Sequence, residues 1–137
     1  MATYLADKSA LARMSHDRVA KRLAPLIADG EVATCGVIEL EVLYSARSER
    51  DLIDMRARRS IAYRRIPMTE ADFLRAEEVM LRLADRGQHR AAGLPDLLIA
   101  AVAERAGLTV LHYDADYDMI AATTGQLVEW VVPKGSL

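Results

Sequence analysis

The chain has 137 residues, of which 52% are apolar, and it carries a formal net charge of −2 at pH 7. We expect residues 1–137 to form one domain with its own core, ending in a flexible tail over residues 132–137. The single cysteine excludes an internal disulfide framework. The start lacks the apolar run of a signal peptide, and no uncharged run approaches the roughly 18 residues of a membrane helix. These features predict a cytoplasmic protein with no membrane segment.

Charge is distributed unevenly along the chain. Residues 47–90 carry eleven arginines and eight acidic residues, whereas residues 91–137 carry two basic and six acidic residues. A basic middle segment beside acidic flanks is compatible with a protein that binds a polyanion through arginine. On charge alone, ordinary solvated helix faces are the better interpretation.

Short apolar runs alternate with helical patterns along the chain. The runs predicted as strands are 4–6, 32–35, 108–113 and 127–132, while residues 66–68 are either a further strand or a linker. The patterns predicted as helices are 9–29 with a break near His16, 37–46, 49–64, 69–86 with Thr69 as N-cap, 94–106 and 117–123. Apolar strands that alternate with helices predict an α/β fold: a three-layer α/β/α sandwich around a mainly parallel central sheet of four or five strands.

Aspartates directly follow two of the predicted strands. Asp7 follows the run 4–6, and Asp114 and Asp116 follow the run 108–113. Ligands of open parallel sheets bind beyond the carboxyl ends of the strands, so these aspartates are candidates for a site. Each of them taken singly is better explained by a turn or an N-cap.

Further acidic residues lie inside apolar helical patterns. Asp96 opens the helix predicted over 94–106, where stabilisation of the helix dipole is the simpler explanation for it alone. Glu39 and Glu41 lie about 200° apart around a helix axis, so they cannot share one site. Periodicity does not choose between these two glutamates.

Carboxylates that converge from separate segments repel one another unless a cation lies between them. An all-oxygen ligand set suits Mg²⁺ or Mn²⁺, and such an ion activates water and neutralises charge on a phosphoryl group. The arginine-rich middle segment could hold an anionic substrate around this centre. If the acidic residues converge in space, the sequence predicts a metal-dependent site for phosphoryl chemistry.

Four motifs follow one another along the chain: YLADKSAL at 4–11, EVLYSA at 41–46, PDLLIAA at 95–101 and HYDADY at 112–117. In their order and approximate spacing they resemble the motifs of PIN-domain nucleases and, more narrowly, of VapC-type toxins from toxin–antitoxin pairs. The resemblance, which extends to about residue 132, implies an endoribonuclease that depends on Mg²⁺ or Mn²⁺ and cuts structured RNA such as transfer or ribosomal RNA. It also implies inhibition by a VapB-like antitoxin and assembly into a homodimer.

The resemblance also implies roles for individual residues. It favours Glu41 over Glu39, and it implies hydrolysis by a metal-activated water that leaves 5′-phosphate and 3′-hydroxyl ends. Ser9 matches a supporting Ser/Thr whose hydroxyl would contact the ion or its waters, and it could also be the N-cap of the first helix. The catalytic quartet implied is Asp7, Glu41, Asp96 and Asp114, and the metal ligands implied are Asp7, Asp96 and Asp114 with Asp116 as an additional or alternate ligand.

Three positions depart from the residues usual in the family, and one of them, Ser45 in place of Gly, is a small change for a packing role. Lys8 replaces Thr beside the first acidic residue, where it could weaken metal binding or point outward toward phosphate. Tyr117 replaces Phe, and we expect it to keep a packing role. The main candidates for RNA contact are Lys8, Arg86, His89 and Arg90, whereas Arg56, Arg58, Arg59, Arg64, Arg65 and Arg82 are better explained as solvated surface.

Two other classes of protein stay open on the sequence alone. The first is another Mg²⁺-dependent phosphoryl hydrolase or a receiver domain, but the chain has Asp7-Lys8-Ser9 where an aspartyl-nucleophile phosphatase needs Asp-x-Asp. A receiver domain needs a late lysine at a strand end, and Lys134 comes too late. The second is a PIN-like module that binds RNA or protein without catalysis, which the presence of all the matching acidic residues argues against.

Overall fold

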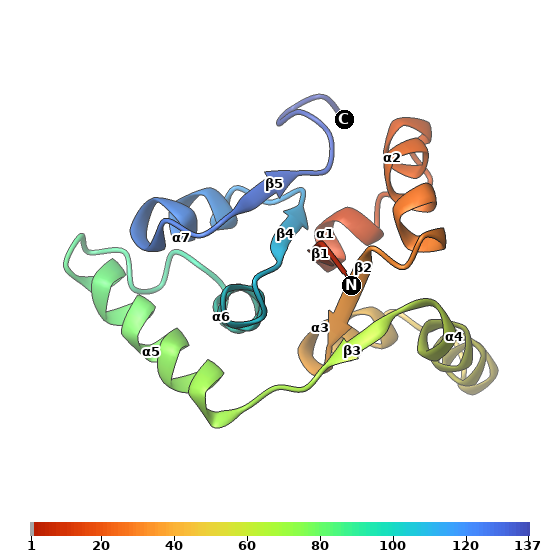
Figure 1. Cartoon of the computed structure of the whole chain (residues 1–137), viewed down its shortest axis with the longest axis horizontal. Coiled ribbons are helices and arrows are strands. Elements are labelled where there is room, and N and C mark those ends of the chain that lie inside the picture. The colour runs from red at the N-terminus through yellow and green to blue at the C-terminus, as the bar shows by residue number, and fades with distance from the viewer. Residues whose placement is uncertain (1) are drawn as a thin grey trace.

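The computed structural model describes residues 2–137 and has a five-stranded sheet at its centre (Figure 1). The strands are β1 (Tyr4–Ala6), β2 (Val32–Cys35), β3 (Arg64–Ile66), β4 (Thr109–His112) and β5 (Val128–Trp130). They lie in the order β3-β2-β1-β4-β5, and every pairing between neighbours is parallel. The predicted parallel sheet is therefore confirmed.

Seven helices are formed within residues 2–137, and most of them match the predicted ranges. They are α1 (Lys8–Leu11), α2 (Asp17–Ala28), α3 (Gly36–Leu43), α4 (Glu49–Ala62), α5 (Glu70–Ala84), α6 (Leu94–Ala106) and α7 (Asp116–Thr124). The predicted break near His16 is confirmed, since α1 ends before this residue and α2 begins after it. The predicted cap is confirmed as well: the Asp72 carboxylate accepts the backbone N–H of Thr69, at 2.8 Å, in front of α5.

The prediction of a helix over residues 49–64 is wrong at its C-terminal end. Tyr63 has extended backbone angles, and Arg64–Ile66 then forms the edge strand β3 beside β2. The pairing with β2 is a tertiary interaction that local helix propensity does not report. The arginines of β3 are exposed, and charged side chains on an edge strand oppose pairing with other chains.

Helices cover both faces of the sheet, which confirms the three-layer sandwich. Side chains of adjacent strand residues point to opposite faces, so Val110 and Leu111 of β4 belong to different buried clusters. One cluster packs α3, α5, α6 and α7 against the sheet, and the other packs α1 and α2 against its opposite face. The helix α6 lies deepest, with Leu97 and every residue from 99 to 103 buried.

The strand order reverses direction between β1 and β4. From β1 the chain passes outward to β2 and β3, and it then returns across the sheet to β4 and β5 on the other side (Figure 1). Ligands bind at such a reversal in open α/β sheets, beyond the carboxyl ends of the two strands. The fold therefore directs attention to the residues that follow β1 and β4.

Two further features concern the chain as a whole. Within residues 2–137, no helix has both the length and the apolar character needed to cross a bilayer. In the segment predicted as a flexible tail, Val132 is buried and the backbone N–H of Leu137 donates to the Tyr113 hydroxyl, at 3.1 Å. The mobility of this tail stays a prediction.

Candidate metal centre

Asp7 lies at the reversal point of the sheet, directly after β1. It is 3% exposed, and its backbone N–H donates to the carbonyl of Leu111 in β4, at 2.9 Å. The carboxylate caps α1, because Oδ2 accepts the backbone N–H of Ser9 at 3.0 Å, while Oδ1 accepts the Tyr117 hydroxyl at 2.8 Å. Both oxygens are thus held by donors from different elements.

The sequence allowed Ser9 to be the N-cap of the first helix, and this alternative is wrong. Asp7 takes that role, and Ser9 lies inside the first turn of α1. The Ser9 hydroxyl oxygen instead accepts the backbone N–H of Tyr113, at 2.9 Å. This bond ties α1 to the segment that leaves β4, so Ser9 supports the relative placement of Asp7 and Asp114.

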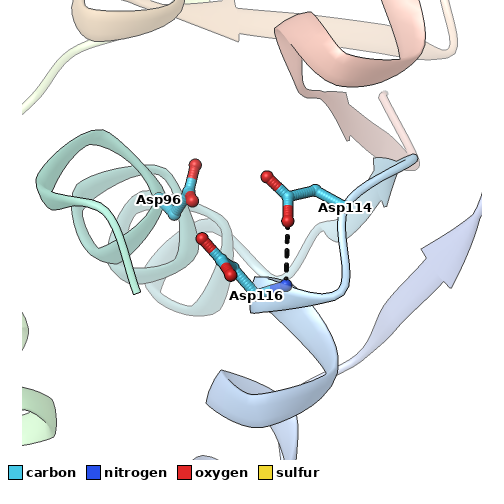
Figure 2. A group of neighbouring side chains, drawn as sticks. All are labelled: Asp96, Asp114 and Asp116. Carbon is cyan, nitrogen blue, oxygen red and sulfur yellow. Dashed lines mark hydrogen bonds between the residues drawn. The ribbon is translucent and has the colours of Figure 1, made fainter. Parts of the chain in front are cut away.

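Three more aspartates form a compact group (Figure 2). One carboxylate oxygen from each of Asp96, Asp114 and Asp116 lies within 4.8 Å of the others. Asp96 comes from the first turn of α6, and Asp116 is the first residue of α7. Asp114 accepts the backbone N–H of Asp116, at 2.9 Å, so the loop after β4 orients this carboxylate itself.

The electrostatics of this group favour a bound proton or cation. Burial, a hydrogen bond with Asp116 and the charges of Asp7, Asp114 and Asp116 together raise the pKa of Asp96 to about 8. Burial and the neighbouring carboxylates thus both disfavour the ionised form of Asp96. A divalent cation between the carboxylates would remove this repulsion, which is the behaviour of a hard-cation site.

Glu41 joins the site from the last turn of α3, whereas Glu39 does not. The Glu41 Oε1 atom is buried without a hydrogen-bond partner among residues 2–137, and burial together with the Asp7 charge raises its pKa. Glu39 has other partners. Its carboxylate accepts hydrogen bonds from Nε and Nη2 of Arg59, at 2.9 and 2.8 Å, and from the hydroxyl of Thr34. The structure therefore separates two acidic residues that helical periodicity could not distinguish.

The four acidic residues of the predicted quartet line one pocket of about 500 Å³. They come from the end of β1, the end of α3, the start of α6 and the loop after β4. The lining of the same pocket also includes two cations, Lys8 and Arg13. The full lining is Asp7, Lys8, Ser9, Ala12, Arg13, Glu41, Asp96, Tyr113, Asp114 and Ala115.

Sequence reasoning missed two residues of this site. Arg13 is fixed by its own bond to the Ser9 carbonyl, at 2.7 Å, and by the ring of Tyr113, whose centroid lies 4.8 Å from the guanidinium carbon. Tyr117 was predicted only to pack, but its hydroxyl contacts Asp7 and Asp96. The packing role came from the resemblance, in which Phe is usual at this position, and a comparison with Phe gives no signal for the hydroxyl.

The predicted RNA-contact residues lie in different places. Lys8 is exposed at the pocket, whereas Arg86, His89 and Arg90 are exposed in the segment between α5 and α6 and lie outside the described pocket lining. Arg59 is committed to its ion pair with Glu39, in which both side chains are nearly buried.

His112 and Trp130 have structural roles beside the site. His112 is buried at the end of β4, burial lowers its pKa, and its Nδ1 accepts the backbone N–H of Asp114 at 3.1 Å. The ring of Trp130 packs against His112, with centroids 4.9 Å apart. Both residues therefore support the end of the sheet that carries Asp114.

Comparison with known proteins places this arrangement in a family. Residues 4–122 match the PIN domain family. The chain is 44% identical to Ribonuclease VapC21 of Mycobacterium tuberculosis over 133 residues, covering 97% of this chain and 96% of the relative. It is also 44% identical to Ribonuclease VapC51 of the same organism, covering 98% and 96% of the two chains.

The fold is shared with a solved toxin–antitoxin complex. The chain superposes on the structure of DNA-bound VapBC from Salmonella typhimurium with a TM-score of 0.76 and 17% identity, covering 96% of this chain and 100% of the other. At this identity the likeness concerns the fold. Together with the matched family range and the two mycobacterial relatives, it shows that the chain belongs to the PIN-domain family, among the VapC ribonucleases.

Proposed function

We propose that this protein is a divalent-metal-dependent endoribonuclease that hydrolyses phosphodiester bonds of structured RNA, with transfer or ribosomal RNA as the substrate class. The observation that carries the proposal is the convergence of Asp7, Glu41, Asp96 and Asp114, from four separate segments, on one pocket. The ribonuclease names of the mycobacterial relatives support the same activity.

The residues of the pocket fit Mg²⁺ or Mn²⁺. All the candidate ligands are carboxylate oxygens, which hard divalent ions prefer, and Asp7, Asp96 and Asp114 with Asp116 would hold the ion. When bound, such an ion lowers the pKa of a water molecule and neutralises charge on the phosphate. The unpartnered Oε1 of Glu41 would accept a hydrogen bond or a proton from a water molecule in the pocket.

The two cations of the pocket would bind the RNA backbone. Lys8 and Arg13 line the same pocket as the acidic residues, so they could contact a phosphate group held there. Of the two roles left open for Lys8, we propose contact with phosphate, since Lys8 is exposed. Arg86, His89 and Arg90 would contact RNA farther from the scissile bond.

A VapB-like antitoxin is the partner that we propose, since the structural neighbours include VapBC complexes. The surface of α3 and α4 exposes apolar side chains that fit a protein partner: Leu40, Tyr44, Leu52, Ile53 and Ile61. The homodimer also stays a proposal, which light scattering of the purified chain would test. The site of action that we propose is the cytoplasm.

The test is cleavage of total RNA by the purified chain. We expect cleavage with Mg²⁺ or Mn²⁺, none with chelator, and a loss of at least about 100-fold in Asp96→Asn. End mapping should find 5′-phosphate and 3′-hydroxyl ends. Asp118→Asn is the matched control, because Asp118 lies on α7 two residues after Asp116 but is exposed and accepts a hydrogen bond from Trp130 outside the pocket lining.

Two results would contradict the proposal. One is RNA binding without any cleavage by the metal-loaded chain, which would make the protein a non-catalytic binding module. The other is cleavage that Asp96→Asn retains in full, which would move the chemistry away from this pocket.

A further inference from the structure

Tyr117 is an aromatic residue whose polar atom contacts two carboxylates of the pocket, those of Asp7 and Asp96. Its side chain is fully buried on α7, and its ring packs against His112 with centroids 4.9 Å apart. The ring alone would explain burial at this position, as it would for Phe. The hydroxyl, however, lies 2.8 Å from Oδ1 of Asp7 and 3.3 Å from Oδ1 of Asp96.

The hydroxyl acts as a donor at this position. A phenol carries one proton, so the shorter contact identifies the Asp7 oxygen as its main acceptor. A protonated phenol between two carboxylates reduces the repulsion that would separate them.

This contact completes the orientation of Asp7. The backbone N–H of Ser9 holds Oδ2 and Tyr117 holds Oδ1, so rotation of the carboxylate would break one of two hydrogen bonds. Each carboxylate oxygen has a second lone-pair site, which is available for a ligand in the pocket that Asp7 lines. With Phe at position 117, Oδ1 of this buried side chain would lose its donor.

We propose that Tyr117 is a positioning residue of the metal site, whose hydroxyl holds Asp7 and Asp96 together before the ion binds and so raises the affinity for divalent ions. This inference rests on the proposed function, because it assumes that these carboxylates bind a metal. Hydrogen-bonding partners of metal ligands typically contribute 10–100-fold to metal affinity. We expect a loss in this range when the hydroxyl is removed.

The test compares Mn²⁺ dissociation constants of the wild-type chain, Tyr117→Phe and Tyr4→Phe, measured by calorimetry at a temperature where all three are folded. Tyr4 is the matched control, because it lies on the strand that leads to Asp7 and its hydroxyl has no hydrogen-bond partner among residues 2–137. Tyr117→Phe should bind Mn²⁺ about 10–100-fold more weakly, and Tyr4→Phe should match wild type. Equal affinity for all three would overturn the inference while leaving the proposed function intact.

A second measurement uses the unaltered tyrosine and covers the case in which Tyr117→Phe does not fold. Addition of Mg²⁺ to the wild-type chain should change the near-UV absorption of a buried tyrosine, because the acceptor of the Tyr117 hydroxyl becomes a metal ligand. The same change should persist in Tyr4→Phe. Ion binding without any tyrosine signal would overturn the inference, and no ion binding by wild type would overturn the proposed function with it.

Discussion

At the scale of single residues, two glutamates that lie two positions apart on α3 have opposite roles. Glu39 forms a nearly buried ion pair with Arg59, whereas Glu41 lies in the pocket with Oε1 unpartnered among the described residues. Sequence periodicity showed that they could not share a site, and only the resemblance to PIN-domain nucleases favoured Glu41. The contacts now give each a distinct physical consequence.

We predict opposite effects for the two glutamine substitutions. Glu39→Gln leaves the Arg59 charge without its partner and should lower the free energy of unfolding by about 3–5 kcal/mol. Glu41→Gln removes a charge that burial and Asp7 already disfavour, so stability should be unchanged or higher while RNA cleavage is lost. Urea unfolding and cleavage assays check the pair; a Glu41→Gln chain that cleaves at the wild-type rate would contradict the assignment.

The raised pKa of Asp96 predicts how stability depends on pH in the metal-free chain. Folded Asp96 keeps its proton up to about pH 8, whereas the unfolded group releases it near 3.8. The unfolded state therefore binds fewer protons in this interval, and the free energy of unfolding falls as pH rises toward 8. The lowered pKa of His112 acts in the opposite direction, but only below about pH 6.5.

Thermal unfolding in chelator between pH 6.5 and 8 isolates the Asp96 contribution. Wild type should lose at most about 1.4 kcal/mol per pH unit, and less because the side chain is only partly buried. Asp96→Asn should lose much less over the same interval. If the free energy of unfolding changes with pH in the same way in wild type and in Asp96→Asn, Asp96 is already ionised at pH 6.5 and the prediction is wrong.

At the scale of elements, the helices differ sharply in how they are held. The helix α6 was predicted over residues 94–106, and the structure gives the same bounds, because its apolar run is buried on nearly all sides. In α4, none of the residues, all of which the structure describes, is buried. Its attachment includes the Arg59–Glu39 ion pair, and its C-terminal boundary was missed because β3 depends on pairing with β2.

We predict that backbone amides of α4 exchange with deuterium much faster than those of α6 in the isolated chain. Helices with few buried contacts open locally at low free-energy cost, whereas amides in a core helix require opening close to global unfolding. Exchange followed by mass spectrometry on peptides covering 49–62 and 94–106 measures the difference. Equal protection would mean that α4 is already covered, for example by a second copy of the chain.

At the scale of the whole molecule, the site depends on the topology of the sheet. Asp7 and Asp114 could be predicted as neighbours, since they follow strands that a parallel sheet can place side by side. The additional approach of Asp96 and Glu41 depends on the packing of α6 and α3, which residue spacing does not determine. The Tyr117 hydroxyl was missed for a related reason: its acceptors are 110 and 21 residues away in the chain.

Anomalous scattering from crystals soaked in Mn²⁺ tests the central claim most directly. The account predicts an anomalous peak within coordination distance of Asp7, Asp96 and Asp114, with Asp116 as an additional or alternate ligand. The peak should be lost in Asp96→Asn crystals of the same form. A chain that cleaves RNA with Mn²⁺ but binds the ion elsewhere, or retains the peak without Asp96, would contradict the account.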